Sequence, residues 1–180
     1  MVNSNIEMEI EIRVECIEAK KQKHLTLICK NAIEKSWEIA QTKLSKDHCL
    51  SNVKTGSIEV SLICISETDM YELNMKHRGH QKPTNVLSFQ GDLLPPPPGE
   101  TVLLGDIALC WKVIEKEAFN LDIPVENHLA HLTIHGVLHL LGYDHNTALI
   151  AKKMEQLECH ILSTMGIESP YEEIQGPYEH

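Results

Sequence analysis

The sequence predicts a single α+β domain, because segments with the periodicity of strands and of helices follow one another in mixed order. Apolar and acidic residues alternate over residues 7–15, and β-branched and apolar residues fill residues 57–65, as in strands. Residues 24–44 carry apolar side chains at helical spacing, with lysine and glutamate on the other face. At 180 residues the chain has the length of one domain. We expect this domain to span residues 1–168, before a mobile tail over residues 169–180 that is rich in Glu, Pro and Gly.

Between the second strand and the next, the sequence predicts a short helix and a long loop. Ser66 with Asp69 three residues later is a capping pattern, which starts a helix that we expect to end at Met75. The glycines and the proline of residues 76–92 then mark a loop around a short strand, VLSF. The four prolines at 95–98 predict a stiff hairpin tip without chemistry.

The last predicted elements are one strand and two helices, and the second helix is unusual. Residues 104–110 form the strand, which leads into a helix that continues to about Asn120. Pro124 begins a longer helix, which is apolar on nearly every side over residues 128–141 and so must be buried. Yet five histidines lie on it or just beyond it, and buried polar groups need partners: His128, His131, His135, His139 and His145.

The spacing of three of these histidines predicts a metal site. His135 and His139 are four residues apart, so both imidazoles project from one helix face and can bind one ion. A continuing helix would carry His145 to another face. Gly142 can take a left-handed conformation that ends the helix and lets the chain turn back. The spacing therefore predicts one zinc per chain on His135, His139 and His145, with a fourth position open to water as in catalytic sites.

The same spacing resembles the metzincin pattern HExxHxxGxxH, with one departure. Gly136 stands where the protease has the glutamate that acts as general base. A metzincin-like zinc peptidase is therefore the weaker alternative. We expect His128 and His131 to be core residues or partners of the ligands.

A basic segment points to a nucleic-acid substrate. Residues 76–82, KHRGHQK, hold three fixed positive charges and no acid, in a chain of net charge −10. Phosphates would dock most readily here, which predicts Lys76 and Lys82 as substrate-binding residues. The alternative for this segment is an ordinary solvated loop.

Other features bear on location and redox state. The N-terminus lacks the basic flank and apolar block of a secretory signal, and no apolar run is long enough to cross a bilayer. Six scattered cysteines form no CxxC pair. We expect a cytoplasmic protein with reduced cysteines and no membrane partner.

Three blocks, HRGHQKPTNVLSF, LLGDIALC and HLTIHGVLHLLGYDH, together resemble the YbeY family of bacterial endoribonucleases, which are rRNA maturation factors. The resemblance is close over about residues 58–168 and holds only in outline before them. It implies a mixed β-sheet of about four strands flanked by helices. It also implies zinc-dependent cleavage of single-stranded RNA, in the maturation of the small-subunit rRNA end and in ribosome quality control. The implied partners are the small ribosomal subunit and its associated proteins.

Carried over by residue, the resemblance implies that Arg78 is the catalytic arginine and that the three histidines bind zinc. The family usually has aspartate where this chain has Asn85, so a charge is missing there. Asp144 is a candidate for turning the chain or for orienting a ligand histidine. Asp106 is a candidate for similar work, and a plain structural hydrogen bond is at least an equal possibility for it. Besides the peptidase, a non-catalytic ribosome-assembly factor with a structural zinc remains an alternative.

Overall fold

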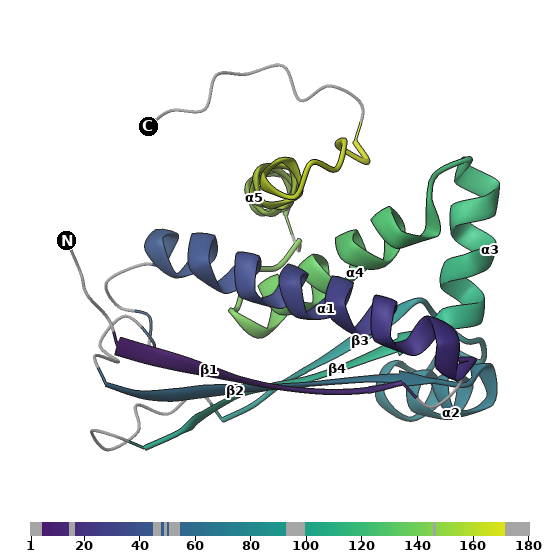
Figure 1. The fold of residues 1–180 in the computed structure, drawn as a ribbon, viewed down its shortest axis with the longest axis horizontal. Helices are drawn as coiled ribbons and strands as arrows, with labels where there is room; N and C mark the ends of the chain where they lie inside the picture. Colours follow the sequence, from purple (N-terminus) through teal and green to yellow (C-terminus); the bar gives the residue numbers. More distant parts are fainter. Residues whose placement is uncertain are drawn as a thin grey trace.

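A computed structural model of the chain describes residues 5–14, 17–44, 48, 50, 55–92, 100–145 and 147–171. The predicted tetraproline tip lies outside these residues. Within them the structure has the predicted α+β fold, with a four-stranded mixed sheet and five α-helices (Figure 1). The elements are β1 (Asn5–Val14), α1 (Ala19–Ala40), η1 (Gln41–Lys43), β2 (Thr55–Ile65), α2 (Glu67–Arg78), β3 (Val86–Gln90), β4 (Val102–Cys110), α3 (Trp111–Leu121), α4 (Val125–Leu140) and α5 (Ala148–Thr164).

The sheet has the strand order β1-β2-β4-β3. Strands β1, β2 and β4 are parallel, and β3 runs antiparallel to β4, with Val86 opposite Leu109. The crossovers between parallel strands pass through helices, as parallel pairing requires. Strand β3 therefore forms the edge of the sheet, on the side where α4 crosses it.

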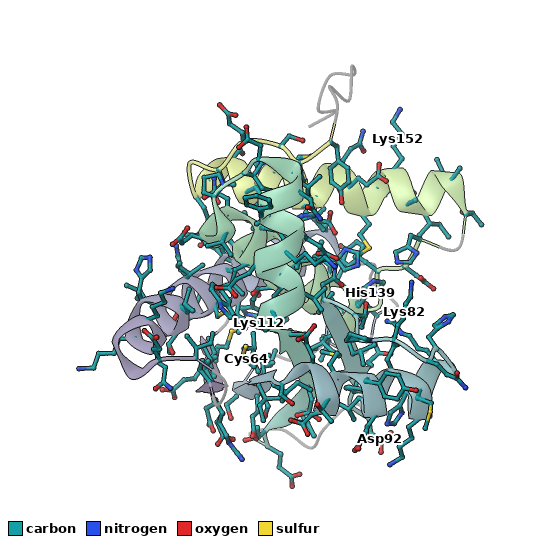
Figure 2. The ribbon with its side chains drawn as sticks, turned by 90° about the vertical axis from the view of Figure 1, so that its right-hand side faces the viewer. Cys64, Lys82, Asp92, Lys112, His139 and Lys152 are labelled. Carbon is teal, nitrogen blue, oxygen red and sulfur yellow. The ribbon has the colours of Figure 1, made fainter. Side chains whose placement is uncertain are left out.

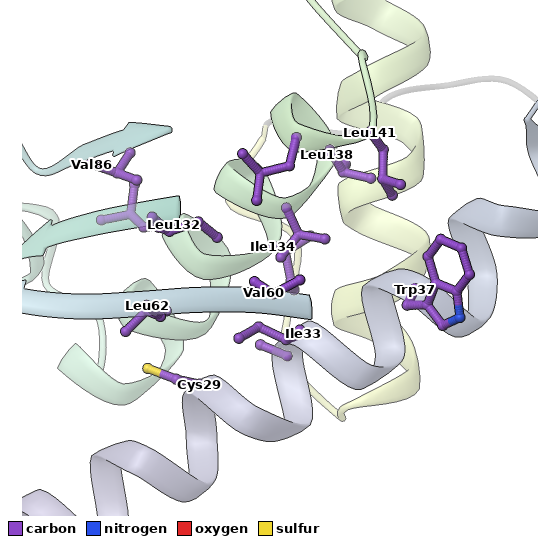
Figure 3. Packing of buried hydrophobic residues seen from close by; sticks show 14 of the residues in the cluster. Cys29, Ile33, Trp37, Val60, Leu62, Val86, Leu132, Ile134, Leu138 and Leu141 are labelled. Atoms are coloured by element: carbon purple, nitrogen blue, oxygen red, sulfur yellow. The ribbon is translucent and has the colours of Figure 1, made fainter. Parts of the chain in front are cut away.

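One face of the sheet carries the main core, beneath α1 and α4 (Figure 1). Alternate residues of β2 point to this face, including Val60 and Leu62, which are at most 2% exposed. Figure 3 shows Val60 between Ile33 of α1 and Ile134 of α4, with Leu62 further along β2. Each such side chain contributes about 1.5–3 kcal/mol by leaving water. The apolar contacts on this face of the sheet thus help to fix the position of α4.

Among the residues that the structure describes, α2 covers one end of the opposite face of the sheet. Met70 of α2 packs there on Leu87 of β3 and Ala108 of β4. Asp106 projects from β4 on this face and is exposed, since side chains alternate along a strand. The suggestion that Asp106 orients a ligand histidine is therefore wrong, because α4 lies on the other face.

Helix α4 is buried along almost its whole length, as predicted. It begins after Pro124 and contacts α1, α3, α5, β3 and β4. Gly136 faces the sheet, where an added Cβ would lie 3.2 Å from Ile107 and from Ser88 Oγ. The missing side chain at this position therefore allows α4 to approach β3 and β4 closely.

Two elements differ from the sequence prediction. Helix α2 continues through Arg78, so the loop predicted from Lys76 is wrong for its first three residues. Gly79, with φ 72°, takes the left-handed conformation that ends the helix. The basic residues of the last turn interact favourably with the negative end of the helix dipole. Helix α5 was not anticipated. In the described part of the chain, no helix is long and apolar enough to span a membrane.

Candidate functional site

Three histidines meet at the C-terminal end of α4. His135 and His139 project from successive turns, and their Nε2 atoms are 3.0 Å apart. His145 joins them from the following turn, so that one ligand atom from each residue lies within 4.8 Å of the others. The His145 ring centroid is 5.0 Å from that of His139 and 5.8 Å from that of His135. The structure thus gathers the three side chains that the spacing singled out.

The turn after α4 explains how His145 returns to the helix. Gly142 has φ 82°, the left-handed conformation expected of it. Its N–H donates to His139 O, and the N–H of Tyr143 donates to Leu138 O, both at 3.0 Å. These two bonds form a Schellman motif, which closes the helix end. Asp144 Oδ1 accepts the backbone N–H of His145 at 2.7 Å, so this carboxylate turns the chain.

Side chains from two other segments hold the last carbonyls of α4. Gln90 of β3 donates from Nε2 to Leu140 O at 2.9 Å, and His48 Nε2 lies 3.1 Å from Leu141 O. The N–H of Leu50 donates to His48 Nδ1, which leaves Nε2 of that ring as the donor. These bonds satisfy carbonyls that a helix end leaves without partners, and they anchor the turn that carries His145.

Glu158 of α5 connects the triad to the protein interior. Its side chain is 1% exposed and accepts a hydrogen bond from His135 Nδ1 at 2.7 Å and from His131 Nε2 at 3.2 Å. The Tyr171 hydroxyl also donates to it. Burial alone would raise the pKa of Glu158, but the hydrogen bonds from His131, His135 and Tyr171 outweigh burial and lower this pKa from 4.5 to about 2. The carboxylate is therefore ionised and acts only as an acceptor.

The chemistry of this arrangement fits a bound metal ion. Because Nδ1 of His135 donates to Glu158, its Nε2 carries a lone pair directed at His139. Burial, followed by the neighbouring His135 and His145, lowers the pKa of His139 from 6.5 to about 4, which keeps this ring neutral. Tetrahedral zinc sets two imidazole nitrogens roughly 3.3 Å apart, close to the observed separation. The triad could hold a metal ion with little rearrangement.

A cleft of about 460 Å³ opens beside the triad. Arg78, at the end of α2, lines this cleft together with the three histidines. Lys76 and Lys82 are exposed and do not line the cleft. In the view of Figure 2, Lys82 is labelled just below His139. Asn74 Nδ2 donates to Lys82 O at 2.7 Å and so holds the loop after α2. The cleft wall consists of Arg78, Asn85, Val86, Ser88, Gln90, His135, His139, Gly142, Tyr143, Asp144 and His145.

Asn85 belongs to a second hydrogen-bonded group in the cleft wall. Its Nδ2 donates to Glu117 Oε2 at 2.9 Å, while its Oδ1 accepts the N–H of Val86 at 2.7 Å. Nε2 of His128 lies 2.8 Å from the same Glu117 oxygen. An aspartate at position 85 would set a second carboxylate against Glu117. The amide therefore suits this chain, and His128 has the core role expected of it.

Sequence reasoning missed the partners of the triad. Glu158 carried a detectable signal, since it lies in an apolar stripe of α5 between Leu157 and Ile161, where a carboxylate needs partners. Gln90 and Tyr171 carried none, because their contacts join segments far apart in the sequence. His131, expected to be a core residue or a partner of a ligand, is bonded to Glu158, which is itself the partner of His135.

Comparisons with known proteins find a family whose profile the chain matches and solved structures that it resembles. The chain is similar to TM1509 from Thermotoga maritima, whose solution structure it matches with 22% sequence identity and a TM-score of 0.48, over 93% of this chain and 99% of that one. The sequence profile of the family described as Endoribonuclease YbeY matches residues 16–166. This match spans most of the sequence, and the chain therefore belongs to the endoribonuclease YbeY family.

Proposed function

We propose that this protein is a zinc-dependent endoribonuclease that cleaves single-stranded RNA, with one zinc on His135, His139 and His145 and with Arg78 as its catalytic arginine. Its cellular role is the maturation of the small-subunit rRNA end and ribosome quality control, in the cytoplasm and in contact with the small ribosomal subunit and its associated proteins. Family membership supports the RNA substrate class.

One observation carries the proposal at the level of the site. A single cleft is lined by three histidines with converging nitrogens and by Arg78. A phosphodiester that enters this cleft meets both. A peptide bond finds no general base at position 136, where a larger side chain would collide with Ile107. The cleft therefore favours phosphodiester over peptide hydrolysis.

The residues that line the cleft and those around it have separate tasks in cleavage. A bound zinc supplies a Lewis acid that polarises a phosphoryl oxygen or activates water near neutral pH. Arg78 donates paired hydrogen bonds to phosphoryl oxygens and stabilises the charge that develops on them. Glu158 holds His135 in the orientation that presents Nε2 to the cleft. Lys76 and Lys82 bind phosphates of the flanking nucleotides, because both are exposed cations beside Arg78.

The test is cleavage of an end-labelled single-stranded RNA by the purified protein, before and after removal of zinc by a chelator and after zinc is restored. We expect cleavage to stop on removal and to return with zinc. Arg78→Ala should lower the rate by about 100- to 1,000-fold and leave the zinc content unchanged. A duplex of the same sequence should be cut far more slowly.

The matched control is Arg13→Ala. Arg13 lies on β1, 62% exposed and ion-paired with Glu11, and it does not line the cleft. This variant should cleave like the wild type. Cleavage that survives both the chelator and Arg78→Ala would contradict the proposal and identify a contaminating nuclease. Unfolding on zinc removal together with unaltered cleavage by Arg78→Ala would favour a structural metal.

A further inference from the structure

The carboxylate of Glu158 receives donors from two different segments. His131 and His135 reach it from α4, whereas Tyr171 reaches it from the segment that follows α5. The Tyr171 ring also packs edge-on against His131, with centroids 5.7 Å apart at 87°. Tyr171 is half-buried and is held by Ser169, whose Oγ accepts its N–H at 3.2 Å. This described part of the predicted tail is therefore attached to the site.

The two carboxylate oxygens of Glu158 accept hydrogen bonds from different partners. Oε1 faces His135 Nδ1 alone, and Oε2 accepts from both His131 and the Tyr171 hydroxyl. The Tyr171 hydroxyl and His131 Nε2 thus hold Oε2 together, and the bonds at Oε2 fix where Oε1 points. At 1% exposure, Glu158 cannot replace a lost donor with bulk water. A change at Tyr171 must therefore appear at His135.

We propose that Tyr171 is a positioning residue for the metal centre, which sets the affinity for zinc through Glu158 and His135. This inference rests on the proposed function, because it takes His135 as a metal ligand. Partners of metal-binding histidines commonly change affinity by about 10- to 100-fold. Tyr171 contacts Glu158 and not the ligand His135 itself, so loss of its hydroxyl should have a smaller effect on the affinity for zinc.

The test measures the zinc dissociation constant by competition with a chromophoric chelator, alongside the melting temperature of the metal-free protein. Tyr171→Phe should weaken zinc binding by about 3- to 10-fold, below the range for a direct partner of a ligand. The matched control is Tyr71→Phe. Tyr71 lies on α2 and does not line the cleft, so this variant should bind zinc like the wild type.

A double-mutant cycle separates positioning from packing. If Tyr171 acts through Glu158, then adding Tyr171→Phe to Glu158→Gln should change zinc affinity by less than about 2-fold. Equal zinc affinities of Tyr171→Phe and Tyr71→Phe would overturn the inference, even with a lower melting temperature. So would additive effects in the cycle. If Glu158→Gln does not fold, the comparison of Tyr171→Phe with Tyr71→Phe still tests the inference. A wild-type protein that binds no zinc would overturn the proposed function itself.

Discussion

The two halves of α4 carry histidines in contrasting environments. In its N-terminal half, His128 and His131 are 8% and 15% exposed, and each Nε2 lies against a carboxylate. In its C-terminal half, His135 and His139 direct their Nε2 atoms at each other and at the cleft. The residue type and the helix are the same in both halves. The partner of each ring therefore decides whether a histidine is structural or available to a ligand.

His135 lies at the boundary between these two groups. Its Nδ1 is bonded to a carboxylate, that of Glu158, just as each ring of the N-terminal half is bonded to a carboxylate. Its Nε2 is open to the cleft. Glu158 also binds His131, so one buried carboxylate serves both halves. The contrast between the two halves can be tested by changing a histidine of the triad, its partner Glu158, or the hydrogen-bonded group around Glu117.

The largest effect is expected from His139→Ala. This change removes a nitrogen from the triad, so zinc affinity should fall by more than about 100-fold, beyond the effect of losing a ligand's partner. Metal analysis of the purified variant should find almost no zinc, and RNA cleavage should be lost. His24→Ala, at an exposed histidine of α1, should retain one zinc per chain. A wild-type zinc content in His139→Ala would refute the ligand assignment.

Glu158→Gln should have the second largest effect. The amide keeps the size of the side chain but accepts less strongly from His135 and His131, so zinc affinity should fall by about 10- to 100-fold. Chelator competition measures this affinity. The matched control is Glu155→Gln, one turn earlier on α5 and not bonded to either histidine. Equal affinities of the two variants would show that the carboxylate does not tune the metal centre.

A smaller effect is expected from Asn85→Asp, in the other group. The new carboxylate would face Glu117, which now accepts from Asn85 at 2.9 Å. Because Glu117 is partly exposed, we expect a loss of only about 1 kcal/mol in the free energy of unfolding. Denaturant unfolding in wild-type and Glu117→Gln backgrounds tests the cause. The loss of stability should vanish in the Glu117→Gln background. An equal loss in the two backgrounds would show that repulsion by Glu117 is not its cause.

The smallest effect is expected from His128→Gln. A glutamine retains a donor for Glu117, so the free energy of unfolding should change by no more than about 1 kcal/mol. Zinc affinity should stay at the wild-type value, because no described hydrogen bond joins His128 to the triad. A drop in zinc affinity as large as that of Glu158→Gln would remove the distinction between the two halves.

Local patterns predicted the parts of the molecule that depend on neighbours in sequence. The burial of α4, the Ser66 cap of α2 and the left-handed Gly142 all follow from spacings of a few residues. Contacts between distant segments did not follow. Glu158 meets His135 only because α5 packs on α4, and Gln90 meets Leu140 only because β3 is an edge strand beneath α4.

The wrong expectation for Asp106 also arises from a contact between segments that are distant in sequence. The sequence shows that this aspartate lies in a strand close to the histidine helix, but it does not show which face of the sheet that helix covers. In the structure α4 packs on the face of Ile107 and Leu109, so Asp106 points away from it. A one-residue change of register would have reversed this outcome, since side chains alternate along a strand.

The proposed ligands are also close together in the chain, all within residues 135–145. An unfolded polypeptide therefore retains much of the chelating group and some affinity for zinc. By linkage, zinc stabilises the folded state only by the difference between its folded and unfolded affinities. Glu158 and Tyr171 join the site only after α5 has docked. If zinc binds as proposed, its coupling to folding comes from the helical placement of His135 and His139 and from these two partners, and a chain in which α5 has not docked would bind zinc more weakly than the folded domain.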